Sequence, residues 1–557
     1  MLTDKIRDNL ENTLKNANLA LLADESGEYR FRKMFTSRST PRELLILNYR
    51  FNKKTSLYAE GYQMLCQFYG TFDKVACVGR CADDRSPYSP LENKEYRLAH
   101  NYILLAHDNS YVLLGFTSCQ KYNGFFRIYE DGMLQMGQST ESLTFEIGDI
   151  VESEFFVILE GISRRKLLER YATFIEKHHP KRGNLTPFMG FSTAYAYYDK
   201  LSSKAVLEDV KTLGLFPSLS YVQLDDGYQS HMGDWLCPSH KFSDGLAHAC
   251  QHIQKLGKKV GLWLAPFIVS GESELIKEHP EWLHTDMDGN LVPAGYLTYG
   301  GWRDTPWYVL DFGVQEVVDH VFCLFSTLKC DYGIDYFKLD ALYWGAMKGL
   351  LYRGHETSVE HYRRALDTIR CAVGEDAILE GINAPLWPSL GLLDIMRVGD
   401  NTERMDERIV HKCKENFSRL WMHHRLWTND ADALCLKSLE DRIVTYESYK
   451  MQLALMLVVG GPLLLSDPLS FYTEYDRALF AKMLMVIKNT LSVDYEHSFE
   501  SFTLHLKNGS RIFIEFNFTR SQQEIILNSG AKDFLNGTGL GSKVLLKPND
   551  VLIVEYR

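Results

Sequence analysis

The chain has 557 residues, which is more than one ordinary hydrophobic core supports, so two or three domains are expected. The formal net charge of −11 argues against a nucleic-acid surface, because such a surface needs a basic patch. The composition, 45% hydrophobic and 24% charged, is that of a globular protein. No apolar run approaches the ~20 residues that a membrane-spanning helix needs.

The first residues and the cysteines bear on the compartment. Met1 to Arg7 lack the apolar core and the small-residue cleavage site of a secretory signal. The 11 cysteines are an odd number, and Cys77 with Cys81 is the only close pair, which favours reduced thiols. We therefore expect a cytoplasmic protein. A zinc site is not expected, because no second Cys or His pair stands at ligand spacing.

The first third of the chain is rich in short strands. Apolar and polar residues alternate between turns from about residue 28 to 160, for example at 43–49, 102–106, 111–115 and 153–159. Many short strands without intervening helices predict an antiparallel β-sandwich. A helical pattern follows at 163–178, and 180–187 has the composition of a linker. We assign residues 1–182 to an N-terminal β-sandwich domain.

From Phe188 the pattern changes to strand, loop and helix in repetition. Eight strands are predicted, at 188–195, 219–226, 259–267, 334–341, 376–382, 393–400, 425–430 and 461–466. Their number and spacing predict a (β/α)8 barrel over residues 183–480. Further strands at 502–506, 511–518 and 551–556 predict a small C-terminal β-domain over 481–557. The fold class is therefore a multidomain α/β protein.

The fourth predicted barrel strand ends in an unusual pair of charges. Lys338 and Asp340 are two residues apart, so their side chains share one face of the strand. Burying two charges costs several kcal/mol unless they pair and find further hydrogen bonds. A structural ion pair would explain this strand alone. If the pair is functional, Lys338 would hold Asp340 in its ionised form.

The other strand ends carry polar groups as well, at the rim where a barrel of this kind places its active site. They comprise Asp225, Asp226, Trp263, Arg397, Asp400, Asp430 and Asp432. Each has an ordinary explanation: a turn, a core tryptophan, a structural ion pair or a helix cap. Their convergence on one rim favours a site.

Several acids, two cations and a tryptophan suit a sugar. Carboxylates accept hydrogen bonds from vicinal hydroxyls, while an indole covers the apolar face of the ring. Hydrolysis of a glycosidic bond needs two carboxyl groups in different protonation states. Asp340 is the candidate for the ionised carboxylate, and Asp400 is the candidate for the proton donor.

These motifs resemble those of the retaining α-galactosidases of glycoside hydrolase family 36. The resemblance covers the barrel and rests on Asp225-Asp226-Gly227, Trp263-Leu264-Ala265-Pro266, His279-Pro280-Glu281-Trp282-Leu283, Tyr308-Val309-Leu310-Asp311, Lys338-Leu339-Asp340, Arg397-Val398-Gly399-Asp400 and Asn429-Asp430-Ala431-Asp432. It implies that Asp340 is the nucleophile and Asp400 the acid/base. It also implies a substrate-binding set of Asp225, Asp226, Trp263, Lys338, Arg397, Tyr195 and Ile382. Neither a metal nor an organic cofactor is implied.

The sequence departs from the family at several positions. Ala194 stands where a pocket tryptophan is expected, Leu65 ends what is often a Gln-Ser-Trp segment, and Ile382 replaces a cysteine. These changes leave the preferred sugar open. The acid is also ambiguous: the Arg-Ile-Gly-Pro-Asp-Thr form of the motif aligns Asn401 with the acid, whereas the Ser-Asp-Asn-Thr form matches Asp400, and we follow the second.

The sequence thus predicts a retaining α-galactosidase acting on a small soluble α-galactoside, without nucleic-acid or membrane partners. Alternatives are a hydrolase or transglycosylase for another α-glycoside, such as an N-acetylgalactosaminide or a glucoside, and a carbohydrate-binding protein that has lost catalysis through Asn401. A metal-dependent hydrolase would need a His-x-His at the first strand end, where the chain reads Ala194-Tyr195-Ala196-Tyr197. Family members are often oligomeric, so a homo-oligomer stays open.

Overall fold

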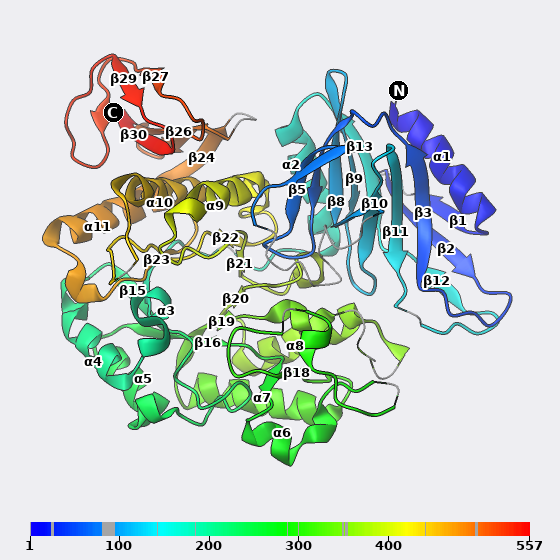
Figure 1. The fold of residues 1–557 in the computed structure, drawn as a ribbon, viewed down its shortest axis with the longest axis horizontal. Helices are drawn as coiled ribbons and strands as arrows, with labels where there is room; N and C mark the ends of the chain where they lie inside the picture. Colours follow the sequence, from blue (N-terminus) through cyan, green and yellow to red (C-terminus); the bar gives the residue numbers. More distant parts are fainter. Residues whose placement is uncertain are drawn as a thin grey trace.

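The computed structural model describes residues 2–23, 27–80, 95–141, 143–183, 185–286, 288–298, 300–347, 350, 352, 355–440, 442–495 and 499–556. Two antiparallel sheets come first, then an eight-stranded parallel sheet curled into a barrel, then a C-terminal antiparallel sheet (Figure 1). This arrangement confirms the predicted fold class. Cys81, half of the close cysteine pair, lies outside the described residues.

The N-terminal strands form two antiparallel sheets. The larger has the order β1-β2-β13-β9-β8-β4-β5-β6, with β12 paired to β2. Its strands are β1 Ala20–Ala23, β2 Glu28–Met34, β4 Ser56–Glu60, β5 Gln67–Thr71, β6 Lys74–Cys77, β8 Tyr102–His107, β9 Ser110–Phe116, β12 Ile150–Glu152 and β13 Phe156–Gly161. The smaller sheet contains β3 Glu43–Arg50, β11 Met133–Ser139, β10 Gly124–Ile128 and β7 Arg97–His100, in that order.

Two helices accompany these sheets. The helix α2, Arg164–His178, matches the predicted pattern at 163–178, and the Ser163 side chain caps its N-terminus. The helix α1, Leu2–Asn16, was not predicted; it buries Ile6, Leu10 and Leu14 at a spacing of four residues against the smaller sheet's β3. That spacing was the available signal.

The barrel strands occur in all eight predicted segments. They are β14 Met189–Ser192, β15 Leu219–Leu224, β16 Lys259–Leu264, β19 Ile334–Leu339, β20 Ile378–Gly381, β21 Ile395–Arg397, β22 Thr428–Asp430 and β23 Leu463–Leu465. They pair in parallel in chain order, and β23 returns to pair with β14. A bridge between Leu434 and Leu465 joins the chain beyond β22 to β23, so the sheet curls round on itself.

Helices follow most of the barrel strands, as expected. They are α4 Ser203–Thr212, α5 Gly245–Lys255, α7 Gln315–Cys330, α8 Ser358–Val373, α9 Asp406–Ser418, α10 Tyr446–Val459 and α11 Glu474–Asn489. Between β20 and β21, residues 382–394 form only a 3-10 turn at Trp387–Ser389. Thr357 and Glu360 form a capping box at the start of α8, which satisfies backbone N–H groups that the helix leaves free.

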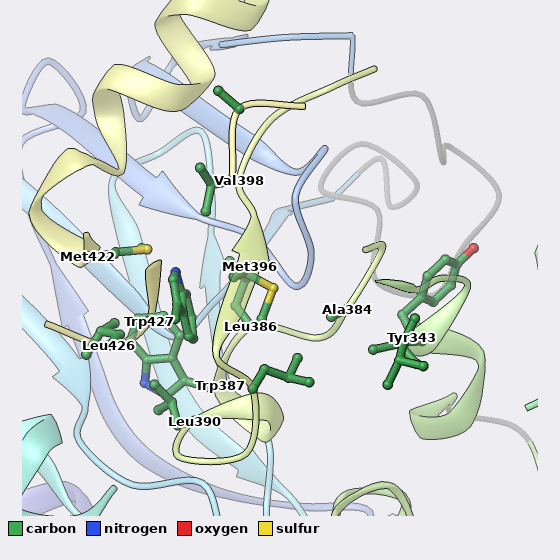
Figure 2. Packing of buried hydrophobic residues seen from close by; sticks show 14 of the residues in the cluster. Tyr343, Ala384, Leu386, Trp387, Leu390, Met396, Val398, Met422, Leu426 and Trp427 are labelled. Carbon is green, nitrogen blue, oxygen red and sulfur yellow. The ribbon is translucent and has the colours of Figure 1, made fainter. Parts of the chain in front are cut away.

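The barrel and the N-terminal sheets share a buried interface. The Trp387 indole N–H donates to the Phe116 carbonyl at 2.7 Å, and its ring stacks on Tyr171 of α2. Figure 2 shows Trp387 within the buried cluster that also contains Leu426 and Trp427 of the barrel. This interface fixes the N-terminal sheets against the fifth and sixth strands.

The C-terminal sheet has the order β24-β25-β26-β30-β28. Its strands are β24 Thr490–Tyr495, β25 Ser501–Leu506, β26 Arg511–Asn517, β28 Lys532–Asp533 and β30 Asp550–Tyr556, while β27 Gln523–Ile526 pairs with β29 Lys543–Leu546. The limit set at residue 480 falls inside α11, which continues to Asn489, so we propose 489/490 as the start of this domain and keep 182 as the end of the first.

Among the described helices, none has the length and apolarity to cross a membrane.

Candidate active site

A cavity with a volume of about 990 Å³ opens at the carboxyl ends of the barrel strands. The predicted catalytic and substrate-binding side chains all line it: Tyr195, Asp225, Asp226, Trp263, Lys338, Asp340, Ile382, Arg397 and Asp400. The cavity is also lined by Leu65, Ala194 and Ile382, the three positions where the sequence departs from the family pattern in the sugar pocket. In the described part of the chain, no group of three or more His, Cys, Asp or Glu side chains is arranged to hold a metal ion.

Asp340 follows β19 and is oriented by three N–H donors. Its Oδ1 accepts from the Ala341 backbone N–H at 2.6 Å and from the Asn383 amide at 3.2 Å, while the Trp263 indole N–H donates to Oδ2 at 3.2 Å. Ala341 has φ +54°, a left-handed conformation that is uncommon outside glycine. Burial raises the pKa of Asp340, and the three donors and Lys338 oppose the rise. The carboxylate is therefore fixed in place by donors that favour its charged form.

The partner of Lys338 differs from the prediction. Its Nζ donates to Asp225 Oδ2 at 2.7 Å, not to Asp340. Burial is the largest single influence on the Lys338 pKa and lowers it, but the carboxylates of Asp225, Glu380 and Asp432 together raise the pKa above its usual value. Lys338 still lowers the pKa of Asp340 through its charge, as expected, but it does so without pairing with that carboxylate, because its ammonium group is bonded to Asp225 at the end of β15.

Asp226 is held by residues that sequence reasoning did not identify. The Arg303 guanidinium forms a two-point ion pair with its carboxylate, with Nε 2.7 Å from Oδ2. The Trp302 indole N–H donates to the same Oδ2 at 3.3 Å, and Gln229 donates to Oδ1 at 2.9 Å. Residues 302–303 lie between β16 and β19, far along the chain from the carboxyl end of either barrel strand. Polar residues that directly follow a barrel strand therefore do not include them.

Arg397 is the centre of a buried charge cluster. Its Nε donates to Asp430 at 2.5 Å, and its Nη2 lies 2.8 Å from Asp432. Asp430 and Asp432 are therefore partners of an arginine, not helix caps, and Arg397 is not paired with Asp400. Burial works against a charge on Asp432, yet Arg397 and Lys412 hold its pKa well below the usual value. The Tyr195 hydroxyl donates to Asp432 at 2.9 Å, which connects the first strand to this cluster.

Asp400 sits just beyond β21 and is almost fully buried. Its Oδ1 accepts from Arg80 Nη2 and from the Asn401 backbone N–H, both at 2.8 Å, and Arg80 Nε donates to Oδ2. The Asp400 N–H donates to Glu415 Oε2 on α9 at 2.8 Å. Asn401 also lines the cavity, with its Oδ1 3.3 Å from Arg397 Nη1, whereas Asp406 is not among the lining residues and starts α9.

The N-terminal sheets complete the cavity wall. Arg419, which follows α9, forms a fully buried ion pair with Glu60 of β4 and donates to the carbonyls of Met64 and Val398 at 2.6 and 2.9 Å. It thereby attaches the segment that carries Leu65 to the end of β21. Arg80 reaches the cavity from the same domain as Leu65. Neither arginine belongs to a barrel motif, so no local sequence pattern could have identified them.

The barrel also matches a family of known proteins. Residues 193–360 match the family described as Melibiase. The first half of the barrel therefore has the Melibiase sequence pattern. Over 149 residues the chain is 34% identical to the α-galactosidase Mel36A of Lactobacillus acidophilus, and over 160 residues it is 27% identical to an α-galactosidase of Escherichia coli. Each match takes in 26% of this chain, but only 18% and 20% of those relatives, respectively.

Solved structures extend the likeness from the barrel to its neighbouring domains. The structure of TtGalA, an α-galactosidase from Thermus thermophilus, has a TM-score of 0.66 and 24% identity, covering 87% of this chain and 97% of that one. The α-galactosidase AgaA of Geobacillus stearothermophilus, assigned to glycoside hydrolase family 36, has a TM-score of 0.66 at 14% identity and covers 95% of this chain and 78% of its own. At these identities the structures show a common fold, and the family resemblance inferred from the motifs is confirmed.

Proposed function

We propose that the protein is a retaining α-galactosidase that cleaves terminal α-linked galactose from soluble oligosaccharides. The observation that supports this most is the convergence of Asp340, Asp400 and the predicted sugar-binding side chains on one 990 Å³ cavity. A cavity of that size accommodates a di- or trisaccharide. The TtGalA structures contain a nitrophenyl α-galactoside or stachyose, and an AgaA structure contains raffinose, so we propose the same substrate class here.

In the proposed first step, an Asp340 carboxylate oxygen bonds to the anomeric carbon as its bond to the glycosidic oxygen breaks. The carboxyl proton of Asp400 moves to that departing oxygen, so that the leaving group is an alcohol and not an alkoxide. In the second step Asp400 takes a proton from water, the water oxygen bonds to the anomeric carbon, and Asp340 leaves. Two inversions return galactose with its α configuration.

The other side chains bind and orient the sugar in this proposal. Asp225 and Asp226 are acceptors for ring hydroxyls, and each is held by a cation, Lys338 or Arg303. Trp263 gives its N–H to Asp340 and presents its ring to the cavity. Arg397, through Asp430 and Asp432, fixes the floor of the pocket.

A second substrate is supported by one set of positions. Ala194 and Leu65 line the cavity where the family pattern has tryptophan, which leaves space beside the sugar, and Ile382 lines it where the pattern has the more polar cysteine. The chain is also 32% identical over 127 residues to a protein of Flavonifractor plautii named as an A type blood α-D-galactosamine galactosaminidase, covering 11% of that relative. An N-acetyl-α-galactosaminide is therefore the second candidate.

The test is a panel of nitrophenyl α-glycosides together with melibiose. We expect turnover of the α-galactoside, and NMR of the first product should show α-galactose before it mutarotates. The Asp340→Ala variant is the matched control and should be inactive. If no α-glycoside is turned over, the protein is a binding protein and the proposed hydrolase is wrong; if β-galactose appears first, the mechanism is inverting.

A further inference from the structure

Arg80 makes an unusual contact for a residue outside the barrel. It follows β6 in the N-terminal sheets, yet its guanidinium holds both carboxylate oxygens of Asp400, 320 residues further along the chain. The Asp400 side chain is 5% exposed, while that of Arg80 is 36% exposed. The ion pair therefore joins a deep carboxylate to a cation that enters from the rim.

The approach of Arg80 is built into the backbone before it. Gly79 packs so closely on Glu415 that a Cβ atom there would lie 1.6 Å from Glu415 Oε1. A side chain at position 79 would force either the Glu415 side chain or this segment to shift, and Arg80 is the next residue of the segment. Gln67 of β5 adds a second anchor, because its amide donates to the Glu415 carbonyl at 3.2 Å.

The charges around the pair identify Arg80 as the main cation acting on Asp400. Glu415 faces Asp400 from α9, and burial followed by the Asp400 charge raises the Glu415 pKa to about 8, which favours its neutral form. Glu403, on the loop after β21, is paired with Arg408 at 3.1 Å. Arg397, the next cation along the strand, is engaged by Asp430 and Asp432.

We propose that Arg80 is a positioning residue for Asp400, through which the N-terminal domain sets the pH range in which Asp400 gives and takes its proton. This inference rests on the proposed function. A guanidinium at hydrogen-bond distance favours the ionised carboxylate. It therefore assists the second step, where Asp400 must be a base, and limits the first step at high pH, where Asp400 must carry a proton.

The experiment compares pH profiles of kcat/KM on melibiose, whose poor leaving group requires the proton. In Arg80→Gln we expect the alkaline limb to move up by about one pH unit or more, because the acid keeps its proton longer. Arg80→Lys keeps the charge without the two-point contact and should move the limb less. Arg127→Ala is the matched control: Arg127 forms a similar two-point pair with Glu43 in the same domain and does not line the cavity.

The possible outcomes distinguish a failure of this inference from a failure of the proposed function. If the wild type turns over melibiose but Arg80→Gln and Arg80→Lys keep the alkaline limb at the wild-type pH and change only KM, Arg80 merely binds substrate and the inference is overturned. An equal shift of the alkaline limb of the kcat/KM profile in Arg127→Ala would overturn the inference as well. If the wild type turns over no α-glycoside, the proposed function fails first and the inference falls with it.

Discussion

Lys338 Nζ lies 2.7 Å from Asp225 Oδ2, so the lysine of the fourth barrel strand pairs with the carboxylate of the second and not with its own strand neighbour Asp340. The two groups are among the most buried charges that line the cavity, with side-chain exposures of 6% and 12%. The pair therefore fixes the position of the Asp225 carboxylate, which we propose binds the sugar. The orientation of Asp340 depends instead on N–H donors.

The first prediction concerns this pair. Lys338→Met leaves Asp225 as a buried carboxylate without its cation, and removing one partner of such a pair costs about 3–5 kcal/mol. We expect kcat/KM on nitrophenyl α-galactoside to fall roughly 10²- to 10³-fold. In a double-mutant cycle, Lys338→Met should cost much less when Asp225 is already Asn, because the charge to be balanced is gone. Additive losses would show that Lys338 acts on some other group.

The second prediction concerns Asp340. Asp340→Ala should lower turnover by about 10⁴-fold or more, the scale on which loss of a covalent nucleophile is felt. Asp340→Gly should regain activity with azide and release the β-azide, since azide attacks from the vacated face. The pKa of Asp340 is raised by burial, and its carboxylate must be ionised to attack, so wild-type kcat/KM should already decline as the pH falls towards 4 from above. Wild-type activity in Asp340→Ala would exclude this assignment.

Most of the site could be predicted from local sequence because strand periodicity and strand ends are local features. A buried strand followed by a charged residue places that residue at the barrel rim, which located Asp225, Lys338, Asp340 and Asp400. What the side chains pair with could not be predicted in this way. The partner of Lys338 lies on another strand, and whether it is Asp225 or Asp340 depends on the register between β19, β16 and β15.

The residues that were missed share a different property. Arg80 and Arg303 reach the cavity from segments without a strand-end pattern, and each acts by pairing with a carboxylate that the sequence did identify. A single arginine on a loop is normally solvated, so nothing in its neighbours distinguishes it. The domain limit set at 480 falls within α11 for a related reason: the helix continues without a break into β24, and no Gly or Pro marks its end.

The third prediction concerns the breadth of the pocket. Because Ala194 and Leu65 stand where the family pattern has tryptophan and so leave space along the wall, kcat/KM for an N-acetyl-α-galactosaminide should lie within about two orders of magnitude of that for the α-galactoside, which is about 3 kcal/mol of discrimination. Ala194→Trp should fill that space and lower the activity on the N-acetylated sugar more than on the plain one. The α-glucoside serves as the control for a general loss of activity in Ala194→Trp. A wild-type preference for galactose of many orders of magnitude would contradict this prediction.

The fourth prediction concerns stability and Glu415. Burial and the Asp400 charge raise its pKa to about 8, above the ordinary 4.5, so the folded state holds this proton more tightly than the unfolded state. Its contribution to stability is then complete below pH 4.5 and is lost as the pH rises through 8. Glu415→Gln removes the dependence, so its melting temperature should exceed that of the wild type by a few degrees at pH 8, and the two should converge near pH 4. Glu375→Gln, on the exposed end of the Arg182 pair, should show no such growing gap.

The last prediction tests which residue is the acid. Asp400 and Asn401 both line the cavity, but an amide cannot give up a proton at a useful rate, and Asp406 lies away from the lining at the start of α9. Asp400→Asn should therefore cripple hydrolysis of melibiose, while the first step on aryl galactosides with good leaving groups should suffer much less, because their departure needs little protonation. Without Asp400 as a base, the second step stays slow. Azide should accelerate this step and yield the α-azide, whereas the Asp340→Gly rescue yields the β-azide. Asn401→Ala, as the neighbouring control, should raise KM with little change in the leaving-group dependence. Full activity of Asp400→Asn on melibiose would instead direct attention to Glu403, the remaining carboxylate on this loop that lines the cavity.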